Sequence, residues 1–571
     1  MEMAEIDGGE LLLRCLEKEG VKRIFGIPDN GYNTVMLHAK DHNIRWIAPR
    51  HEAAAVHMAE GVFKTTGEIP VVMSGAGPGT ANLVSGIICA REEGVPVIAI
   101  TGQRRREVIY PSWPGVFQGT DQYDIFKPIT KWNAVVHDWS RIPEIIARAF
   151  REALTGRPGP VQIDISESIF HEVREDNTVR ILKPHQYRCE KPEISSKQVE
   201  KIAQIINGAG TVLLMAGTGV INSGGTDSLV KLAEMLSCPV ITSMAARSAF
   251  PNDHPNFLFG LQRGGLAARS EAEVVLALGT RLGELDLPFD KYWGDYSSQK
   301  IIQIDIDPRS VGANRPIYMG VVADAKSAID ALIDYFEERG VEKKDSELIR
   351  KYRELDEAQM LEFADILEQY KGERIHPAHS VIIAREVFPP DAINVGDGGN
   401  TSLFNAIFTS FTRPRTSLGI FEFGHLGTGI PYAIGAKAAN PDKEVYVITG
   451  DGAAGFNFME IETAVRENIK INVIVHAEGS WCMEEIGQIA TFGDPSKVVA
   501  CEQYPVRWDK VAEGLGAYSE YVERLDELKG AFQRARDASK AAVVCVKTDR
   551  QANLIPPAAD IFSQVYTGPQ E

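Results

Sequence analysis

The sequence lacks an excess of basic residues. Its 571 residues include 60 Lys and Arg against 78 Asp and Glu, which gives a formal net charge of −18 and a pI near 5.3. Proteins that bind nucleic acids or anionic membranes need a basic surface to neutralise phosphate groups. We therefore expect no nucleic-acid partner and no membrane partner, and we expect the substrate to be a small molecule.

Paired cysteines and long apolar runs are also missing. The seven cysteines are an odd number without any CxxC spacing, which disfavours both a disulfide framework and a zinc site. No run approaches the roughly 18 apolar residues of a membrane helix, and the amino terminus is acidic and amphipathic, unlike a signal peptide. These absences favour reduced thiols and a soluble, cytoplasmic protein.

Several catalytic signatures are absent as well. The chain contains no HExxH metal motif and no GxSxG nucleophile elbow. The turn Gly217-Thr218-Gly219 does not continue with the GxGxxG spacing of a dinucleotide site, and Asp227 lies too near it in the chain to bind a ribose. Metalloprotease, α/β hydrolase and dehydrogenase functions are therefore disfavoured.

The sequence does contain a regular alternation of short apolar strands and amphipathic helices. This alternation indicates mostly parallel sheets with helices on both faces, and a chain of this length needs several cores. We predict an α/β fold of three consecutive domains of this kind. The expected segments are an N-terminal domain at 1–185, a central domain at 195–340, a charged helical linker at 341–374, a C-terminal domain at 375–550 and a tail at 551–571 that could fold over the site as a lid.

The stretch from Val445 to Trp481 organises the rest of the chain. We predict a strand, a Gly450-Asp451-Gly452 turn, one helix that continues through Met459, and a second strand that ends in a polar loop. Glycine turns at helix N-termini bind anions, and parallel sheets bind ligands at the carboxyl ends of their strands. Asp451 and Glu478 are expected at this same edge, where two carboxylates beside a phosphate site predict Mg²⁺ holding a diphosphate.

Other candidate residues each allow two interpretations. Glu52 opens an alanine-rich helix, either as a first-turn glutamate favoured by the helix dipole or as a catalytic carboxylate in an apolar pocket. The glycine-rich turns at Ser74–Asn82 and Gly398–Thr401 could line a ligand or only allow close packing. Gln118 could contact a substrate or belong to an ordinary surface loop, and a lone histidine such as His425 is more often structural.

Short motifs are spread over nearly the whole chain. They are FGIP at 25–28, RHEAAA at 50–55, AEG at 59–61, SGAGPGTAN at 74–82, FQGTDQ at 117–122, GRPGPVQIDI at 156–165, IIQIDIDP at 301–308, HLGTGIPYAIGA at 425–436 and GDG at 450–452. Together they resemble the thiamine-diphosphate-dependent enzymes of the acetolactate synthase, pyruvate oxidase, benzaldehyde lyase and 2-hydroxyacyl-CoA lyase type. The resemblance implies a pyrimidine-binding domain, a central domain and a diphosphate-binding domain, in that order.

The resemblance also implies catalytic roles. Glu52 matches the glutamate that hydrogen-bonds the aminopyrimidine ring and drives the tautomer that deprotonates C2 of the thiazolium ring. Leu426 matches the apolar residue that holds the cofactor in a bent shape, and Gln118 matches a glutamine of the substrate pocket. Glu484 is a charge where relatives tend to be apolar. It could protonate or deprotonate a substrate hydroxyl, or it could be a glutamate at a helix start that faces solvent. We predict Glu52, Gln118 and Glu484 as the catalytic residues.

At the metal site the sequence departs from the family pattern. Asp451 matches the first metal ligand, but Ala477-Glu478 stands where the family normally carries Asn-Asn. Glu478 is still predicted to bind Mg²⁺, directly or through a water, and Ser480 to bind it through the backbone carbonyl. The predicted cofactor-binding residues are Pro28, Glu52, Gly77, Asn82, Gly398, Gly399, Asn400, Thr401, His425, Leu426, Gly450, Asp451, Gly452, Ala453, Ala454, Glu478, Ser480, Trp481, Cys482 and Met483.

Thiamine diphosphate and Mg²⁺ are thus the implied cofactors. FAD stays open, because some relatives bind it in the central domain but nothing in this sequence requires it. The resemblance further implies a homodimer or homotetramer in which Glu52 of one subunit meets Asp451 of another. Arg281 matches an arginine that reaches the second 2-oxo acid in acetolactate synthases, although lyase relatives carry it too.

Three functions remain open at this point. The leading one is an acetolactate synthase-like carboligase or decarboxylase that acts on a 2-oxo acid through a C2 ylide and an enamine. The second is a lyase that cleaves a 2-hydroxy ketone or a 2-hydroxyacyl-CoA, which is favoured if Glu484 points into the pocket and the central domain accepts the ADP moiety of coenzyme A. The third is a cofactor-binding relative without turnover, which the altered metal loop suggests.

Overall fold

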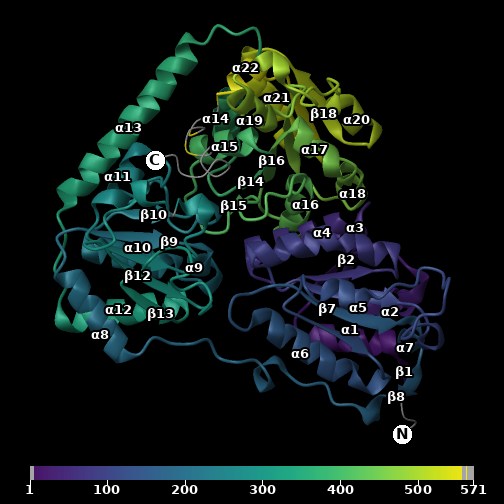
Figure 1. Cartoon of the computed structure of the whole chain (residues 1–571). Coiled ribbons are helices and arrows are strands. Elements are labelled where there is room, and N and C mark those ends of the chain that lie inside the picture. The colour runs from purple at the N-terminus through teal and green to yellow at the C-terminus, as the bar shows by residue number, and fades with distance from the viewer. Residues whose placement is uncertain (1–4, 288, 556–557, 559–560, 562–571) are drawn as a thin grey trace.

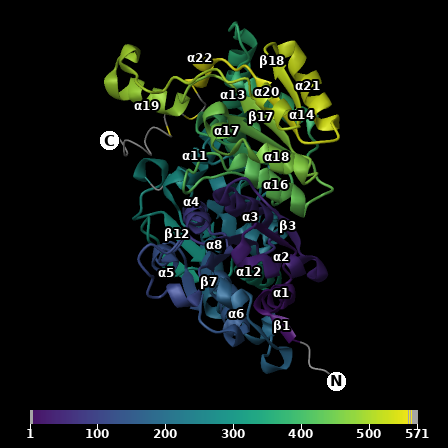
Figure 2. The ribbon, with the colours of Figure 1, turned by 90° about the vertical axis from the view of Figure 1, so that its right-hand side faces the viewer.

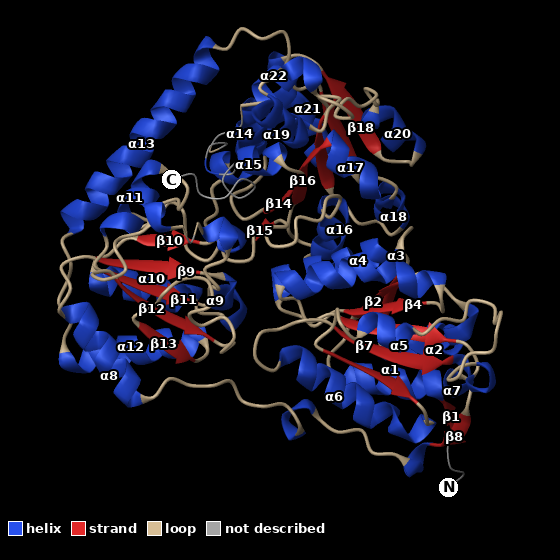
Figure 3. Cartoon of the chain, in the orientation of Figure 1, coloured by secondary structure: helices blue, strands red, loops and turns tan. Residues whose placement is uncertain are grey.

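The computed structural model describes residues 5–287, 289–555, 558 and 561. Figure 1 shows three lobes, formed in chain order by the N-terminal, central and C-terminal parts, and Figure 3 shows that each lobe has a sheet with helices around it. Each large sheet is entirely parallel. The prediction of three consecutive α/β domains is therefore confirmed. No helix of the described residues is both long and apolar enough to cross a bilayer.

The N-terminal domain is built on six strands in the order β3-β2-β4-β5-β7-β6. The strands are β2 (Arg23–Gly26), β3 (Arg45–Ile47), β4 (Val71–Ser74), β5 (Ile98–Gln103), β6 (Trp132–Val136) and β7 (Val161–Ser166). Helices α1 (Gly8–Lys18), α3 (Glu52–Thr66), α4 (Pro78–Glu93) and α6 (Ile142–Leu154) cover them. A separate antiparallel pair joins β1 (Glu5–Asp7) to β8 (Val173–Glu175).

The central domain carries five strands in the order β10-β9-β11-β12-β13. They are β9 (Val212–Ala216), β10 (Val240–Thr242), β11 (Val274–Leu278), β12 (Lys300–Asp305) and β13 (Met319–Val322), packed against α8 (Ser196–Asn207), α10 (Thr226–Leu236) and α12 (Ala325–Arg339). The edge strand β13 is only partly buried and leaves a weaker apolar pattern in the sequence than the other four strands.

The predicted charged linker forms α13 (Ser346–Gln369), which spans about 36 Å at 1.5 Å per residue. Only Ile349 and Tyr352 in it are buried, and they lie in the half that packs on α11 (Arg263–Glu271). The rest of α13 crosses from the central to the C-terminal lobe along the outside (Figure 1). Most acidic and basic residues of α13 therefore face solvent, as their spacing predicts, whereas the Asp356 carboxylate accepts the backbone N–H of Gly264 on α11 at 2.6 Å.

The C-terminal domain holds the sheet β15-β14-β16-β17-β19-β18. Its strands are β14 (Ile393–Asp397), β15 (Ser417–Leu418), β16 (Val445–Gly450), β17 (Asn472–His476), β18 (Tyr518–Val522) and β19 (Ala542–Val546). Its helix α16 (Gly429–Ala439) packs directly on α3 of the N-terminal domain, so one hydrophobic core continues across both domains. Figure 2, turned by 90°, again shows the C-terminal lobe above the N-terminal one.

The prediction of a single helix after Asp451 is wrong. The structure has two helices, α17 (Asp451–Asn457) and α18 (Glu460–Arg466), with Met459 about half exposed between them. The break lets the Asn457 amide donate to the carbonyl of Gly427 and lets the Glu460 carboxylate accept hydrogen bonds from the N-terminal domain at the backbone N–H groups of Arg50 and His51. These tertiary contacts outweigh the helical periodicity of the segment.

Candidate active site

The carboxyl ends of β14, β16 and β17 lie side by side and form one edge of the C-terminal sheet. A cavity of about 380 Å³ opens there, at the position where open α/β sheets bind their ligands. Its lining comes from the C-terminal and central domains: Met244, Glu284, Leu285, Gly398, Gly399, Asn400, Thr401, Ser402, Leu403, Ile420, Phe421, Glu422, Phe423, Gly424, Leu426, Gly450, Asp451, Gly452, Ala453, Glu478, Ser480, Trp481, Cys482, Met483, Glu484 and Asn553.

Asp451 and Glu478 meet at this edge, as the sequence predicts. The Asp451 carboxylate accepts the backbone N–H of Gly452 at 2.8 Å and that of Gly479 at 2.6 Å, which ties the end of β16 to the loop after β17. Burial raises the pKa of both carboxyl groups, and the nearby charge of Asp451 raises the pKa of Glu478 further. Two buried carboxylates that repel each other in this way suit a divalent cation between them.

Amide groups beside Glu478 add to this donor set. The side-chain N–H of Asn553 donates to Glu478 Oε1 at 2.6 Å, and the amide of Asn400 donates to the backbone carbonyl of Asn553 at 2.8 Å. The side-chain oxygens of Asn400 and Asn553 are buried, and neither has a hydrogen-bond partner within the described residues. Carboxylate and amide oxygens are hard ligands, so the residues present fit Mg²⁺.

Replacing Asn553 with Ala should weaken divalent-metal binding by about 10-fold to 100-fold, because the loss of an outer partner lets a ligand carboxylate move. Titration with Mn²⁺, followed by electron paramagnetic resonance, would measure the change. Gln551→Ala is the matched control, because Gln551 lies on the same short helix α22 (Arg550–Asn553) but is exposed. Equal metal affinity in both variants would show that Asn553 does not position Glu478.

Two helices begin at the cavity and could hold an anion. Helix α17 begins at Asp451, directly after Gly450, and α15 (Asn400–Phe408) begins after Gly398 and Gly399. The free N–H groups of a helix N-terminus favour phosphate. Close packing requires glycine here, because a Cβ at Gly452 would lie only 2.6 Å from the Trp481 ring.

The loop after β17 is held from outside the cavity. The Ser480 hydroxyl donates to Glu485 Oε2 at 2.6 Å, and Arg550 donates to the same oxygen at 2.9 Å. Sequence reasoning missed Glu485, Arg550 and Asn553. Arg550 and Asn553 lie about 70 residues beyond the loop in the chain, and a single sequence carries no signal for their contacts with the loop.

The neighbouring Gly396-Asp397-Gly398 turn serves a different purpose. Asp397 also ends a strand, but its carboxylate accepts the backbone N–H groups of Gly427 at 3.1 Å and Gly429 at 2.9 Å. It therefore anchors the start of α16. Of this turn, Gly398 lines the cavity and Asp397 does not.

The N-terminal candidates form a second cluster. Glu52 begins α3, is 9% exposed and accepts a hydrogen bond from the Asn82 amide at 2.9 Å. Gly77 has a φ of +63°, and a Cβ there would lie 2.5 Å from the carbonyl oxygen of Gln118, so these two loops touch. Pro28 is followed by Asp29, whose carboxylate packs on Gly75 of the same turn. This cluster places a buried carboxylate beside a glycine-rich loop.

The two clusters are separate within one chain. None of Pro28, Glu52, Gly77, Asn82 or Gln118 lines the cavity of the C-terminal domain. His425 and Ala454 do not line it either. The His425 ring lies 4.9 Å from the ring of His57, and Ala454 is buried in the core. Leu426 and Glu484 do line the cavity, and the Glu484 side chain is exposed.

A second cavity, of about 550 Å³, lies at the carboxyl edge of the central sheet and extends to both other domains. Arg281 and Arg157 line this second cavity, whereas Arg281 is not part of the first one. The Arg281 guanidinium pairs with the Glu422 carboxylate at 2.9 Å. Glu422 lines both cavities and therefore lies in the wall between them.

Comparison with known proteins agrees with this arrangement. Three family models match: the N-terminal TPP binding domain of thiamine pyrophosphate enzymes at residues 6–125, their central domain at 199–332 and their C-terminal TPP binding domain at 397–546. A probable acetolactate synthase large subunit of Methanocaldococcus jannaschii is 32% identical over 98% of this chain and 95% of its own length. The chain belongs to the thiamine pyrophosphate enzyme family.

Other relatives in this family carry similar names. An acetolactate synthase of Mycobacterium bovis is 31% identical over 95% of this chain and 88% of its own length. An acetolactate synthase large subunit of Haemophilus influenzae is 28% identical over 97% of this chain and 96% of its own length. Thiamine pyrophosphate is thiamine diphosphate, so the chain is an enzyme that depends on this cofactor. The roles of individual site residues stay predictions.

Proposed function

We propose that this thiamine diphosphate enzyme decarboxylates a 2-oxo acid and joins the remaining acyl group to a second carbonyl compound, as an acetolactate synthase does. The observation that carries the proposal is the buried Asp451 and Glu478 pair, which lies beside two helix N-termini and two unpartnered amide oxygens. That donor set fits Mg²⁺ and a diphosphate. When bound, thiamine diphosphate supplies a nucleophilic carbon that adds to a carbonyl group.

The protein would hold this cofactor from both ends. Asp451, Glu478 and the Ser480 carbonyl would bind Mg²⁺, and the N-termini of α15 and α17 would bind the diphosphate. Leu426, in the cavity wall, would support the bend between the two rings. Glu52, held by the Asn82 amide, would exchange a proton with the aminopyrimidine ring.

We further propose that the complete site combines two subunits, at least a homodimer. The support is the separation of the Glu52 cluster from the Asp451 cavity within one chain. Co-expression of Glu52→Gln and Asp451→Asn chains with different affinity tags would test this. A mixed dimer with shared sites has one intact site and one doubly altered site, so activity should return to about half that of the unaltered dimer. No recovered activity in the purified mixed dimer would contradict a shared site.

Release of CO₂ from 2-oxo acids, measured with and without thiamine diphosphate and Mg²⁺, would test the reaction itself. The lyase alternative keeps some support because Glu484 lines the cavity. The same assay should therefore include a 2-hydroxy ketone and a 2-hydroxyacyl-CoA as substrates. Cleavage of either without CO₂ release from any 2-oxo acid would favour the lyase. Membership of an enzyme family disfavours the hypothesis of a relative without turnover.

Only the size and the position of the cavity in the central domain favour a bound nucleotide such as FAD. It opens at the carboxyl ends of β9, β11 and β12, beside Gly217, Thr218 and Gly219. The visible absorbance of the purified protein would decide whether a flavin is bound.

A further inference from the structure

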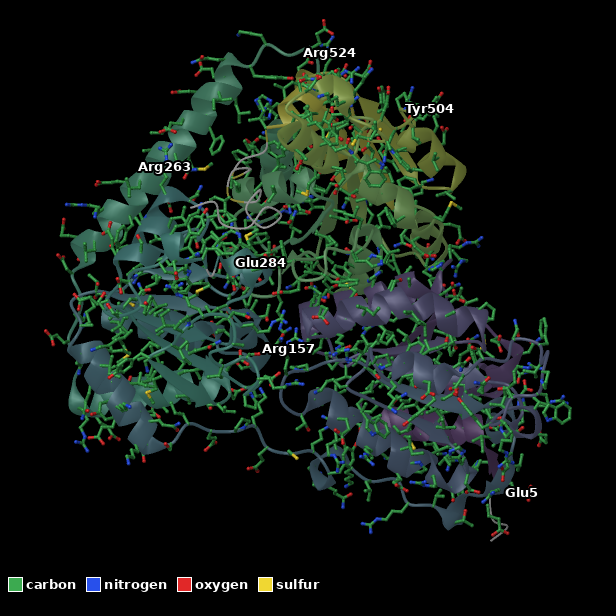
Figure 4. All side chains as sticks on the ribbon, viewed as in Figure 1. Glu5, Arg157, Arg263, Glu284, Tyr504 and Arg524 are labelled. Carbon is green, nitrogen blue, oxygen red and sulfur yellow. The ribbon has the colours of Figure 1, made fainter. Side chains whose placement is uncertain are left out.

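The charged side chains that line the substrate cavity are all negative. Five carboxylates line it, those of Glu284, Glu422, Asp451, Glu478 and Glu484, and no Lys, Arg or His of the described residues does. Asp451 and Glu478 fit the metal, which leaves three carboxylates around the remaining space. Figure 4 places Glu284 on the side of the central domain that faces the C-terminal domain. A second substrate would therefore meet negative charge on more than one side.

The arginine that contacts Glu422 is neutralised by it. Arg281 pairs with Glu422 at 2.9 Å and donates a further hydrogen bond to the carbonyl of Glu92 at 3.2 Å. Because Glu422 lies in the wall between the two cavities, it stands between Arg281 and the substrate space. An arginine held in this way has little attraction left for the carboxylate of a substrate.

The N-terminal segments that a partner subunit would bring to a shared site add no Lys or Arg. The partner-side segments 28–30, 74–82 and 117–122 contain no Lys or Arg, and they bring Asp29 and Asp121 in addition to Glu52. Arg50, two residues before Glu52, is exposed and lies 3.9 Å from Glu462. The tail 551–571 contains no Lys, Arg or His in its sequence. The tail sequence therefore offers no cation for a substrate carboxylate.

We propose that the acceptor of this enzyme is an uncharged aldehyde or ketone, and that Glu422 excludes a second 2-oxo acid by neutralising Arg281. The proposal rests on the proposed function, because the donor is still a 2-oxo acid. The donor carboxylate leaves as CO₂, so negative surroundings favour its loss. An acceptor carboxylate would remain in the cavity through the whole reaction and would be repelled.

The balanced reaction shows the difference. For an aldehyde acceptor it is R–CO–COO⁻ + R′–CHO + H⁺ → R–CO–CH(OH)–R′ + CO₂. One carbon–carbon bond of the donor breaks, one new carbon–carbon bond forms, and the acceptor oxygen takes up the proton. The product is an uncharged 2-hydroxy ketone, whereas a 2-oxo acid acceptor would give a product that keeps a carboxylate. The uncharged product matches a cavity without a cation.

A matched pair of acceptors tests the proposal. With pyruvate as donor, 2-oxobutanoate and its methyl ester compete as acceptors that differ mainly in charge, and mass spectrometry quantifies both products relative to CO₂ released. We expect the holoenzyme to favour the ester by about tenfold or more. Glu422→Gln should free Arg281 and shift the product ratio about tenfold toward the carboxylate. The double variant Glu422→Gln/Arg281→Gln should lose that shift.

Glu373→Gln, in the exposed linker, is the control and should leave the ratio unchanged. A holoenzyme that favours 2-oxobutanoate, or a ratio that Glu422→Gln does not move, would overturn the proposal while CO₂ release still supports the proposed function. Absence of CO₂ release from pyruvate, 2-oxobutanoate and other 2-oxo acids would overturn both. Thermal unfolding of each variant shows whether the ratio is measured on folded protein.

Discussion

Replacing Asp451 with Asn is expected to weaken divalent-metal binding by about 100-fold or more and to abolish metal-dependent binding of thiamine diphosphate. The carboxylate carries the negative charge that Mg²⁺ needs, and loss even of an outer partner of a ligand costs about 10-fold to 100-fold in metal affinity. The neutral amide oxygen of Asn also cannot accept both backbone N–H groups, from Gly452 and Gly479, as well as the carboxylate does. Calorimetric titration with Mg²⁺ and the cofactor would measure both losses.

The neighbouring turn supplies a matched control for this variant. Asp397 also ends a strand of the same sheet and also accepts two backbone N–H groups, but it anchors α16 and does not line the cavity. Asp397→Asn should therefore lower the thermal unfolding temperature with a smaller effect on metal affinity. Equal loss of metal affinity in the two variants would mean that the Asp451 effect is structural.

Replacing Glu52 with Gln should slow hydrogen–deuterium exchange at C2 of bound thiamine diphosphate by about 10²-fold to 10⁴-fold, the usual contribution of general acid–base catalysis. Gln has nearly the same shape as Glu and can still accept a hydrogen bond from the Asn82 amide, so the fold and the diphosphate site should persist. It cannot take up the ring proton. Proton NMR of the cofactor after rapid acid quench would follow the exchange.

Two observations would separate this effect from a general loss of structure. Thiamine diphosphate should still bind to the Glu52→Gln protein, because the residues that we propose as metal and diphosphate ligands lie in another domain. Glu107→Gln, at an exposed position of the same domain, should exchange at the unaltered rate. Unchanged exchange in the Glu52 variant would remove its proposed role.

The fold was predictable because buried parallel strands leave a strong pattern. Apolar runs such as those of β5, β9 and β16 are buried along nearly their whole length, so they stand out between amphipathic helices. The edge strands β6 and β18 are harder to predict, because they are partly exposed and their mixed composition resembles that of loops. The domain limits 1–185, 195–340 and 375–550 stay predictions.

The site was predictable only where its residues are close in the chain or match a family motif. Asp451 and Glu478 belong to adjacent strands joined by one connection, so their meeting follows from the βαβ pattern. Asn553 and Arg550 reach the same loop from far along the chain, and the Arg281 to Glu422 pair joins two domains. Contacts of that kind depend on how the domains pack, and local pattern does not encode it. The lid proposed for residues 551–571 falls largely outside the described residues.

Titration of the full-length protein with thiamine diphosphate, with and without Mg²⁺, tests whether Asp451 and Glu478 hold the cofactor through a metal ion. Isothermal calorimetry should show saturable binding of one cofactor per chain in the presence of Mg²⁺. A chelator that removes the metal should cause a large loss of affinity, because we propose that one cation joins the diphosphate to the Asp451 and Glu478 carboxylates. Absence of binding with Mg²⁺ present, or equal affinity with and without the metal, would contradict the account.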